Sequence, residues 1–235
     1  MFNWCYMKIL YIGQLNEGGT CLDRSKGLVR AGFEVVGFNV LPFNSKWRVI
    51  SSLQHRTKFK FLLRDLNDAI IAFANTVKGV DVVWVDKGIY VFPETIGYLK
   101  QHYRCRVVHY TPDPQIMFHA SRHVMGAIPY YDLMVTTKSF EVELYRAAGV
   151  NNLFLSQQGF CPIRYAEPIP DERYSSDVGF VGHFETHYAR VISFLADNGV
   201  SCHVWGKGWE AAKRSGRVSK NVKTGPGIWG PDYVR

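Results

Sequence analysis

The chain has 235 residues, of which 47% are hydrophobic and 20% are charged, and this composition excludes a disordered or fibrous protein. Lys and Arg outnumber Asp and Glu by 28 to 20, so the net charge of +8 favours an acidic partner such as a nucleotide diphosphate, an anionic acceptor, nucleic acid or a membrane surface. No apolar run reaches the roughly 18 residues of a membrane span, and the N-terminus lacks the basic region and cleavage site of a secretion signal. Five scattered cysteines without a C-x-x-C pair fit a reduced, cytoplasmic location.

Short apolar runs alternate with helical patterns from residue 8 to residue 156, which is typical of an α/β fold with a mostly parallel, Rossmann-like sheet. The predicted strands are Lys8–Ile12, Glu34–Asn39, Asp81–Val85, Arg106–Tyr110, Leu133–Thr136 and Leu153–Ser156. The predicted helices are Cys21–Ala31, Leu53–Lys78, Pro93–His102, Met117–Ala127 and Phe140–Ala148. Pro93 suits the first turn of a helix, and Gly32 and Gly149 suit helix C-caps.

The pattern stops near residue 160 and restarts at Asp177. Residues 161–176 contain prolines and charged residues without a hydrophobic period, so we interpret them as a linker between domain 1–160 and domain 177–235. A strand at Val178–Val181, a helix at Tyr188–Asn198 and a strand at Ser201–Trp205 begin this second Rossmann-like domain. It is shorter than the roughly 100 residues that such a domain usually needs, so we expect it to be incomplete. An unpartnered edge of its sheet favours a homo-oligomer.

Polar residues follow several strands of the first domain, at the edge where open α/β sheets bind ligands. Gly18, Gly19 and Thr20 form a glycine-rich turn before a helix, which lets backbone N–H groups approach a ligand, although a tight turn without a ligand fits equally well. His109 and Asp113 lie at the C-terminal edge of the fourth strand and are candidate general bases toward an acceptor hydroxyl. Taken singly, a buried histidine and a turn-stabilising aspartate are the simpler interpretations.

The next two strands bring further polar residues to the same edge. Lys138 follows the fifth strand and suits either a phosphate or a cover for the sheet end. Ser139 beside it is the expected N-cap of the next helix. Gln157 and Gln158 follow the sixth strand. Several polar groups at one edge indicate a binding cleft more strongly than any one of these residues does alone.

The second domain repeats the arrangement of strand, glycine turn and helix. Gly182 and His183 follow its first strand, and Arg190 lies close behind in the helical pattern. A cation and free N–H groups at the start of a helix suit the pyrophosphate of a sugar nucleotide. The alternative is a solvated helix start in which Glu185 is ordinary capping chemistry.

Several catalytic motifs are absent from the sequence. No D-x-D triplet occurs, which argues against the metal-dependent, single-domain type of glycosyltransferase. No G-x-S-x-G, H-E-x-x-H or C-x-x-C occurs, so nucleophilic and zinc chemistry are disfavoured. The basic stretches Lys46–Arg64 and Lys207–Lys223 favour solvated helix faces and loops over a nucleic-acid site, since no recognised nucleic-acid-binding module accompanies them.

A series of motifs runs in order along almost the whole chain. They are ILYIG with GGTCLDR, VVWVDKG with PET, VVHYTPDP, YDLMVTTKSFEVE, FLSQQGF, DVGFVGHFETHYAR, VWGKGW and GPDYV. Together they resemble the CgeB-like spore-maturation glycosyltransferases, a group of the GT-B superfamily of two facing Rossmann-like domains. The family continues past the GPDYV motif into a segment that binds the donor ribose, so the resemblance implies that this chain holds only part of an active site.

The resemblance implies transfer of a sugar, without a metal or other cofactor, from a UDP- or other NDP-sugar to a small-molecule, glycan or protein acceptor. The first domain would face the acceptor and the second would hold the donor. By position, the acceptor-side loop contains Gly18, Gly19, Thr20 and Arg24; Asp113, with His109 behind it, lies opposite the anomeric carbon; and Gly182, His183 and Arg190 approach the donor phosphates.

Two questions stay open from the sequence. If the reaction inverts the anomeric configuration, His109 or Asp113 is the base, whereas in a retaining reaction they stabilise the donor sugar. The alternative to an enzyme is a glycan- or protein-binding module built on a degenerate GT-B domain, which predicts acceptor binding without nucleotide-sugar hydrolysis.

Overall fold

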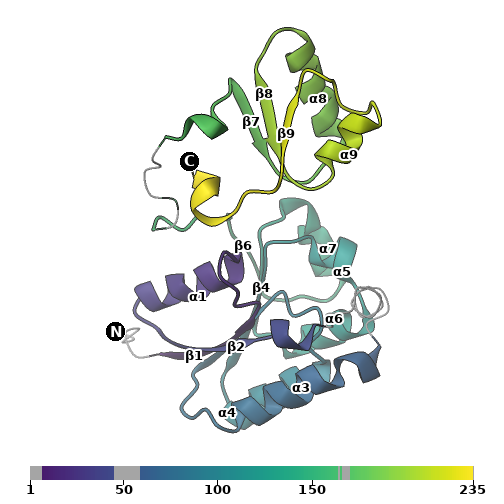
Figure 1. Ribbon diagram of the computed structural model, residues 1–235. Coiled ribbons are helices and arrows are strands. Elements are labelled where there is room, and N and C mark those ends of the chain that lie inside the picture. Colours follow the sequence, from purple (N-terminus) through teal and green to yellow (C-terminus); the bar gives the residue numbers. More distant parts are fainter. Residues whose placement is uncertain (1–6, 45–58, 164, 166–169, 235) are drawn as a thin grey trace. The chain divides into compact units, whose positions relative to one another are not determined.

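The computed structural model describes residues 7–44, 59–163, 165 and 170–234. The chain divides into two compact units, Met1–Gly159 and Phe160–Arg235, which we call unit 1 and unit 2. Each unit contains its own parallel sheet (Figure 1), and each is described by itself below.

Unit 1 contains a six-stranded sheet in the order β2-β1-β3-β4-β5-β6, and every neighbouring pair of strands is parallel. Residue pairs such as Leu10–Val83 and Val85–His109 set the register. The strands are β1 (Lys8–Gly13), β2 (Glu34–Asn39), β3 (Val82–Asp86), β4 (Arg106–Thr111), β5 (Leu133–Thr136) and β6 (Leu153–Leu155). The predicted α/β fold with a Rossmann-like parallel sheet is confirmed.

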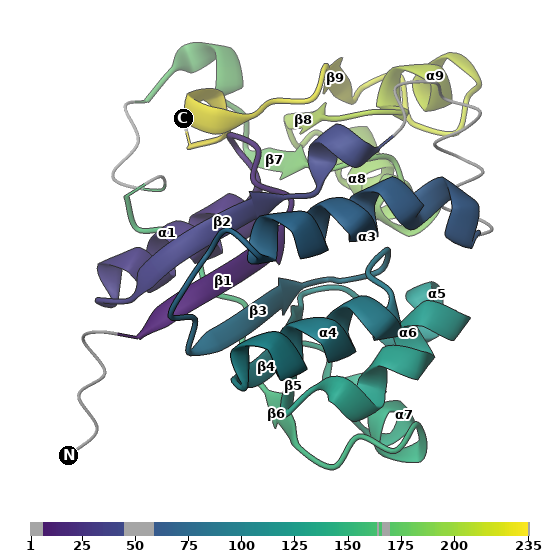
Figure 2. The ribbon, with the colours of Figure 1, turned by 90° about the horizontal axis from the view of Figure 1, so that it is seen from below.

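Helices cover both faces of this sheet, as the double-sided burial of a parallel sheet requires. The described helices of unit 1 are α1 (Thr20–Arg30), α3 (Lys60–Ala74), α4 (Pro93–Tyr103), α5 (Gln115–His119), α6 (Arg122–Ala127) and α7 (Val142–Ala147), with 3-10 turns at Leu41–Phe43, Ile128–Tyr130 and Ser139–Glu141. Helices α3 and α4 lie side by side (Figure 2) and bury Ile70 and Leu99 against Leu10 and Val83 of the strands. Helix α1 packs on the opposite face, where Cys21 meets Ile9 and Tyr11.

Three local predictions for unit 1 need correction or a limit. The single helix expected over Met117–Ala127 is two helices, because the chain is extended at Ser121 and its side chain accepts a hydrogen bond from the Val124 N–H at 3.2 Å as the cap of α6. Ser139 does not cap the next helix, since it lies inside a 3-10 turn that begins after Lys138 without a side-chain cap bond. The helix expected from Leu53 begins at Lys60 in the described part of the chain, and residues 45–58, with most of the Lys46–Arg64 stretch, lie outside it.

Unit 2 contains a three-stranded parallel sheet in the order β7-β8-β9. Its elements are β7 (Val178–Val181), α8 (Thr186–Asp197), β8 (Cys202–Trp205), α9 (Trp209–Arg214) and β9 (Lys223–Gly225), with 3-10 turns at Glu172–Tyr174 and Gly230–Val234. The fully buried Trp209 packs with Ile192 of α8 and Val204 of β8 in the core. Strand β9 is absent from the predicted elements, since its three residues Lys-Thr-Gly carry no apolar alternation.

Candidate functional site at the carboxyl edge of the first sheet

The strand order of unit 1 creates a crevice between β1 and β3. From β1 the chain crosses to β2 on one side, whereas from β3 it crosses to β4 on the other, so the two connections diverge at their carboxyl ends. Ligands of open α/β sheets bind at such a point. Here it contains a cavity of about 30 Å³, lined in part by Ile12, Asp86, Lys87 and Tyr90. That volume has room for only one or two water molecules, so a sugar would have to bind outside it.

A buried ion pair lies beside the crevice between β1 and β3. The Asp86 carboxylate at the end of β3 is fully buried and accepts hydrogen bonds from Arg24 Nε at 2.6 Å and Arg24 Nη2 at 2.9 Å. The Tyr11 hydroxyl donates a further hydrogen bond to Asp86 Oδ2, and the Cys21 thiol lies 3.3 Å from Oδ1. The Arg24 guanidinium also lies 4.6 Å from the centre of the Tyr110 ring. Two parallel N–H···O bonds fix both the position and the orientation of the guanidinium.

This network gives Arg24 a structural role that the sequence did not indicate. Burial disfavours the charge on Arg24, but the hydrogen bonds and the negative charge of Asp86 outweigh burial and raise the pKa of the guanidinium. Burial, together with the same carboxylate, raises the pKa of the Tyr11 hydroxyl. Arg24 is therefore a permanent cation whose partner is Asp86, and its side chain is only 21% exposed.

A second polar cluster surrounds Lys87, the residue after β3. Lys87 has a left-handed backbone with φ of 64°, and its ammonium lies 2.7 Å from the Asp113 carboxylate. Its carbonyl oxygen accepts a hydrogen bond from Gln115 Nε2 at 2.9 Å and lies 3.1 Å from His109 Nε2. The structure thus brings the predicted pair His109 and Asp113 together through a third residue, Lys87.

His109 lies beneath the surface at this point. The residue is 1% exposed, and burial lowers the pKa of its imidazole to about 4, so the ring is neutral at physiological pH. Because a carbonyl oxygen only accepts, the proton of the neutral ring lies on Nε2. Nδ1 has no hydrogen-bond partner among the described residues. His109 is therefore buried below Lys87, the residue whose ammonium contacts Asp113.

Asp113 faces the solvent on a turn that is held from two sides. Its side chain is 38% exposed. Its backbone N–H donates to the hydroxyl of the fully buried Thr111 at 3.1 Å. The Thr137 hydroxyl donates to the carbonyl oxygen of Pro112 at 3.2 Å. Asp113 therefore has a fixed backbone, one engaged carboxylate oxygen and an open face.

The glycine-rich turn after β1 precedes α1 as predicted. Gly18 has φ of 80°, where glycine is favoured, and Gly19 is the N-cap residue of α1. A Cβ on Gly19 would lie 2.8 Å from Asn16 Oδ1, so the close approach of Asn16 explains this glycine without a ligand. Thr20 is exposed in the first turn of α1, which has no side-chain cap bond.

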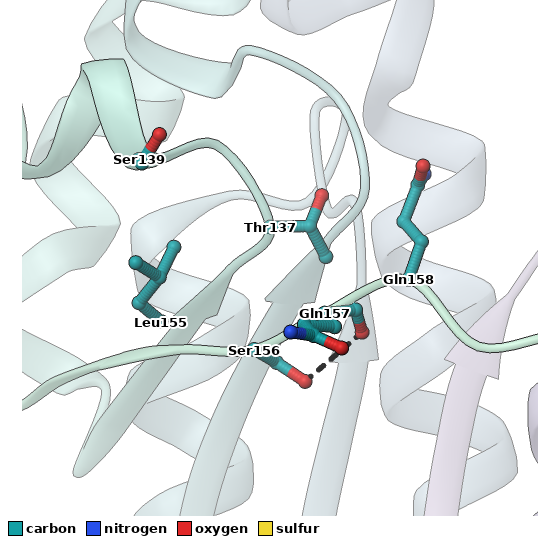
Figure 3. A pocket seen from close by; sticks show the side chains of 6 residues that line it. All are labelled: Thr137, Ser139, Leu155, Ser156, Gln157 and Gln158. Carbon is teal, nitrogen blue, oxygen red and sulfur yellow. Dashed lines mark hydrogen bonds between the residues drawn. The ribbon is translucent and has the colours of Figure 1, made fainter.

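Lys138 and Gln158 lie farther along the same edge. An open hollow of about 420 Å³ is lined by residues at the end of β6 and after β5 and β6, namely Thr137, Ser139, Leu155, Ser156, Gln157 and Gln158. Figure 3 shows the Gln158 side chain and the Thr137 hydroxyl pointing to the same side, whereas the Ser156 hydroxyl turns toward the Gln157 carbonyl oxygen. Lys138 is half-buried beside this hollow. Strands β1 and β6 are four spacings apart, about 19 Å, so Gly18–Arg24 and Gln158 do not converge on one small ligand.

In unit 2 the predicted residues lie around the first turn and helix. Gly182 accepts a hydrogen bond from the Trp209 indole at 2.9 Å through its carbonyl oxygen. The exposed His183 lies 3.2 Å from the carboxylate of Glu185, which precedes α8 and places a negative charge beside the helix start. Arg190 is exposed in the second turn of α8, one turn beyond the free N–H groups.

Three functional candidates in unit 1 escape prediction from the sequence. Asp86 ends the apolar run VVWV, and a carboxylate at the end of a buried strand signals a partnered charge. Lys87 precedes a glycine in a strand-end turn, which signals an unusual backbone. Gln115 shows no comparable signal in the sequence, because its burial depends on the packing of α5 against the fully buried Glu141. The Glu141 carboxylate accepts hydrogen bonds from the backbone N–H groups of Gln115 and Met117 at 2.9 Å each.

Within the described residues, no group of three or more His, Cys, Asp or Glu side chains is arranged to hold a metal ion. In the same part of the chain, no helix combines the length and the apolar character of a membrane span.

Among solved structures, the chain is similar to UGT2 of Phytolacca americana, which was complexed with UDP-2fluoro-glucose and pterostilbene. The alignment covers 96% of this chain and 72% of that chain, with 10% sequence identity and a TM-score of 0.46. No protein-family model matches the chain. No curated protein matches it either.

Proposed function

We propose that the chain is a glycosyltransferase of the GT-B type, similar to the CgeB-like group, in which unit 1 binds the acceptor and unit 2 binds a UDP- or other NDP-sugar. The observation that carries the proposal is Asp113, a carboxylate with an open face and a fixed backbone at the ligand-binding edge of a doubly wound sheet. A general base needs both access to its substrate and a fixed position.

In the inverting form of this reaction, Asp113 accepts the proton of the acceptor hydroxyl while the hydroxyl oxygen bonds to the anomeric carbon of the donor sugar. The bond between that carbon and the phosphate oxygen breaks, and its electron pair leaves with the nucleotide diphosphate. Arg190 and the N–H groups at the start of α8 are the groups of unit 2 that we assign to the developing phosphate charge. Neither the proton transfer nor the charge stabilisation in this proposal uses a metal ion.

Nucleotide specificity and turnover test the proposal together. The chain and a version extended past Arg235 are screened by thermal shift against UDP, GDP, dTDP and their sugars, and hydrolysis of the sugars is assayed in parallel on both. We expect a rise in Tm for one nucleotide, and hydrolysis of its sugar in the extended version. Asp113→Asn should lower turnover about 100-fold or more, as expected for loss of a general base. Glu143→Gln is the matched control, because it neutralises an exposed, ion-paired carboxylate elsewhere in unit 1.

Full turnover by the Asp113→Asn variant would remove Asp113 from the catalytic role. Absence of a nucleotide-dependent shift and of hydrolysis in both versions would overturn the glycosyltransferase proposal.

A glycan- or protein-binding module is the second candidate. One observation favours it: Asp113 Oδ2 is already engaged by the Lys87 ammonium at 2.7 Å, so this oxygen has a partner other than an acceptor hydroxyl. This candidate predicts acceptor binding that Asp113→Asn leaves nearly unchanged, without hydrolysis of any nucleotide sugar.

A homo-oligomer is a separate proposal. Light scattering of the chain over a range of concentrations tests it.

A further inference from the structure

Lys87 combines three unusual features at the crevice between β1 and β3. It is one of two described residues other than glycine with a positive φ, and the following Gly88 has φ of 58°. Left-handed backbone is unfavourable for a residue with a Cβ, and such strain concentrates at functional sites. The Lys87 side chain is 31% exposed and reaches the carboxylate of Asp113.

Buried groups hold this backbone from below. Gln115 and His109, each 1% exposed, both lie within hydrogen-bond distance of the Lys87 carbonyl oxygen, and the Lys87 N–H donates to the Tyr110 carbonyl oxygen at 2.8 Å. Gln115 Oε1 and His109 Nδ1 have no hydrogen-bond partner among the described residues. Gln115 and His109 therefore each direct one ring or amide nitrogen at the Lys87 carbonyl oxygen, and their other side-chain polar atom makes no hydrogen bond to a described residue.

Gly88 completes the arrangement by leaving no room for a side chain. A Cβ at this position would lie 2.8 Å from Val85 Cγ1 and 3.3 Å from the Tyr131 hydroxyl oxygen. The turn is therefore fixed on both sides of Lys87, and the direction of the Lys87 Cα–Cβ bond is fixed with it.

We infer that Lys87 is a positioning residue for the acceptor side of the site, held in its left-handed backbone by Gln115 and His109 so that its ammonium orients the Asp113 carboxylate toward the acceptor hydroxyl. This inference rests on the proposed function for its role in turnover. We call the other half of the inference its mechanical part: two buried donors, on Gln115 and His109, order the Lys87 side chain. This half holds or fails whether or not the chain is an enzyme.

The mechanical part is tested by NMR on the intact chain, through the order parameter of the Lys87 Cε–Nζ bond. Gln115→Met retains the approximate shape of the side chain and removes the donor, and Gln101→Met on the exposed face of α4 is the matched control. We expect a rigid Lys87 side chain in the wild type and in Gln101→Met, and in Gln115→Met a mobility close to that of the exposed Lys26. A Lys87 signal as mobile in the wild type as that of Lys26 overturns the inference, whether or not the chain transfers a sugar.

The catalytic part is tested with Lys87→Gly, which accepts the left-handed backbone and lacks the ammonium. Arg104→Gly is the matched control, since Arg104 is the other described residue of this kind, with φ of 51° at the exposed end of α4. Both variants should keep the wild-type Tm, so a folding defect does not obscure the result. Lys87→Gly should lower kcat about 10- to 100-fold with little change in the acceptor KM, as expected when a reacting group is misplaced. Lys87→Arg should regain part of the lost kcat.

Wild-type kcat in Lys87→Gly would overturn the positioning role while leaving the proposed function intact. Absence of turnover in the wild type as well as in both variants would instead count against the proposed function, and the NMR measurement would then decide the mechanical part alone.

Discussion

The two units build the carboxyl end of their first strand in different ways. Unit 1 places a buried charge beside it, Asp86 at the end of the neighbouring strand β3, and surrounds this charge with Arg24, Tyr11 and Cys21. Unit 2 places backbone against backbone: a Cβ on Gly206 would lie 1.9 Å from the Gly182 carbonyl oxygen, and the Trp209 indole donates to that same oxygen. The same strand–turn–helix pattern in a sequence is therefore compatible with a charged network or with a close glycine contact, and the choice depends on what is buried beside it.

The largest contrast is expected from Arg24→Ala. Removal of the guanidinium leaves the Asp86 carboxylate buried without a cation, so the free energy of unfolding of unit 1 should fall by about 3 to 5 kcal/mol. Lys26→Ala on the same helix should cost about 0.5 kcal/mol or less, because this lysine is half-exposed and lies 3.5 Å from Glu17. Urea unfolding followed by circular dichroism measures both variants. Equal losses would mean that the charge network does not stabilise unit 1.

Acid should weaken unit 1 through His109. Burial lowers the pKa of its imidazole from 6.5 to about 4, so between these values the unfolded chain takes up a proton that the folded chain does not. The free energy of unfolding should therefore fall by about 3 kcal/mol as the pH drops from 6.5 to 4. His109→Gln should lose this part of the pH dependence when Tm is measured against pH.

His203 gives the corresponding comparison in unit 2. Burial, and then the positive charge of Lys223, lowers the pKa of His203, so the sign of the pH effect is the same. His203 is less deeply buried than His109, and we expect His203→Gln to change the pH dependence of Tm less than His109→Gln does. A larger effect at His203 would reverse the comparison between the units.

Gly206→Ala tests the backbone contact of unit 2. The added methyl group would meet the Gly182 carbonyl oxygen, so the loops after β7 and β8 must separate, at a cost of about 1 to 3 kcal/mol. Gly199→Ala is the control for backbone conformation alone, because Gly199 has φ of 89° and a Cβ there would meet no atom within 4 Å. Hydrogen exchange of the Gly182 and Phe184 amides should increase in Gly206→Ala but not in Gly199→Ala. Equal protection in both variants would show that the contact is dispensable.

Substitutions at helix caps should give the smallest difference in stability loss between the two units. Ser121→Ala removes the hydrogen bond to the Val124 N–H at the start of α6 in unit 1 and should cost about 1 kcal/mol. Glu185 precedes α8 in unit 2 without a side-chain cap bond, so Glu185→Ala should change the stability by about 0.5 kcal/mol or less. Thermal unfolding measures both, and a larger loss at Glu185 would assign it a capping role.

The sequence predicted the fold better than the site. The strands of unit 1 carry continuous apolar runs, so their predicted bounds differ from β1–β6 by at most one residue at each end. Strand β9 escaped prediction because its pairing with β8, rather than its own residues, defines it as a strand. The division of the helix at Ser121 depends on one capping hydrogen bond, which a hydrophobic pattern does not contain.

The candidate site shows the limit of residue patterns more sharply. His109 and Asp113 were predicted from their place at the carboxyl end of β4, and the strand order brings them to the expected edge. Arg24 was assigned to an acceptor loop by resemblance, whereas its nitrogens bind Asp86, a residue 62 positions away in the chain. Segments that are distant in the sequence bury a charged side chain and so determine whether it faces a ligand or a counter-ion. A local sequence motif does not contain this information.

The aromatic side chains beside the Asp86 network give the molecule an internal optical reporter. The Trp84 ring lies 6.3 Å from the ring of Tyr11 and 5.9 Å from that of Tyr110, and the Arg24 guanidinium lies over the Tyr110 ring. Indole emission shifts with the polarity and charge of its surroundings. The difference between the emission spectra of the wild type and Trp84→Phe therefore isolates light from the surroundings of the Asp86 network, and a ligand that disturbs this network becomes visible without a label.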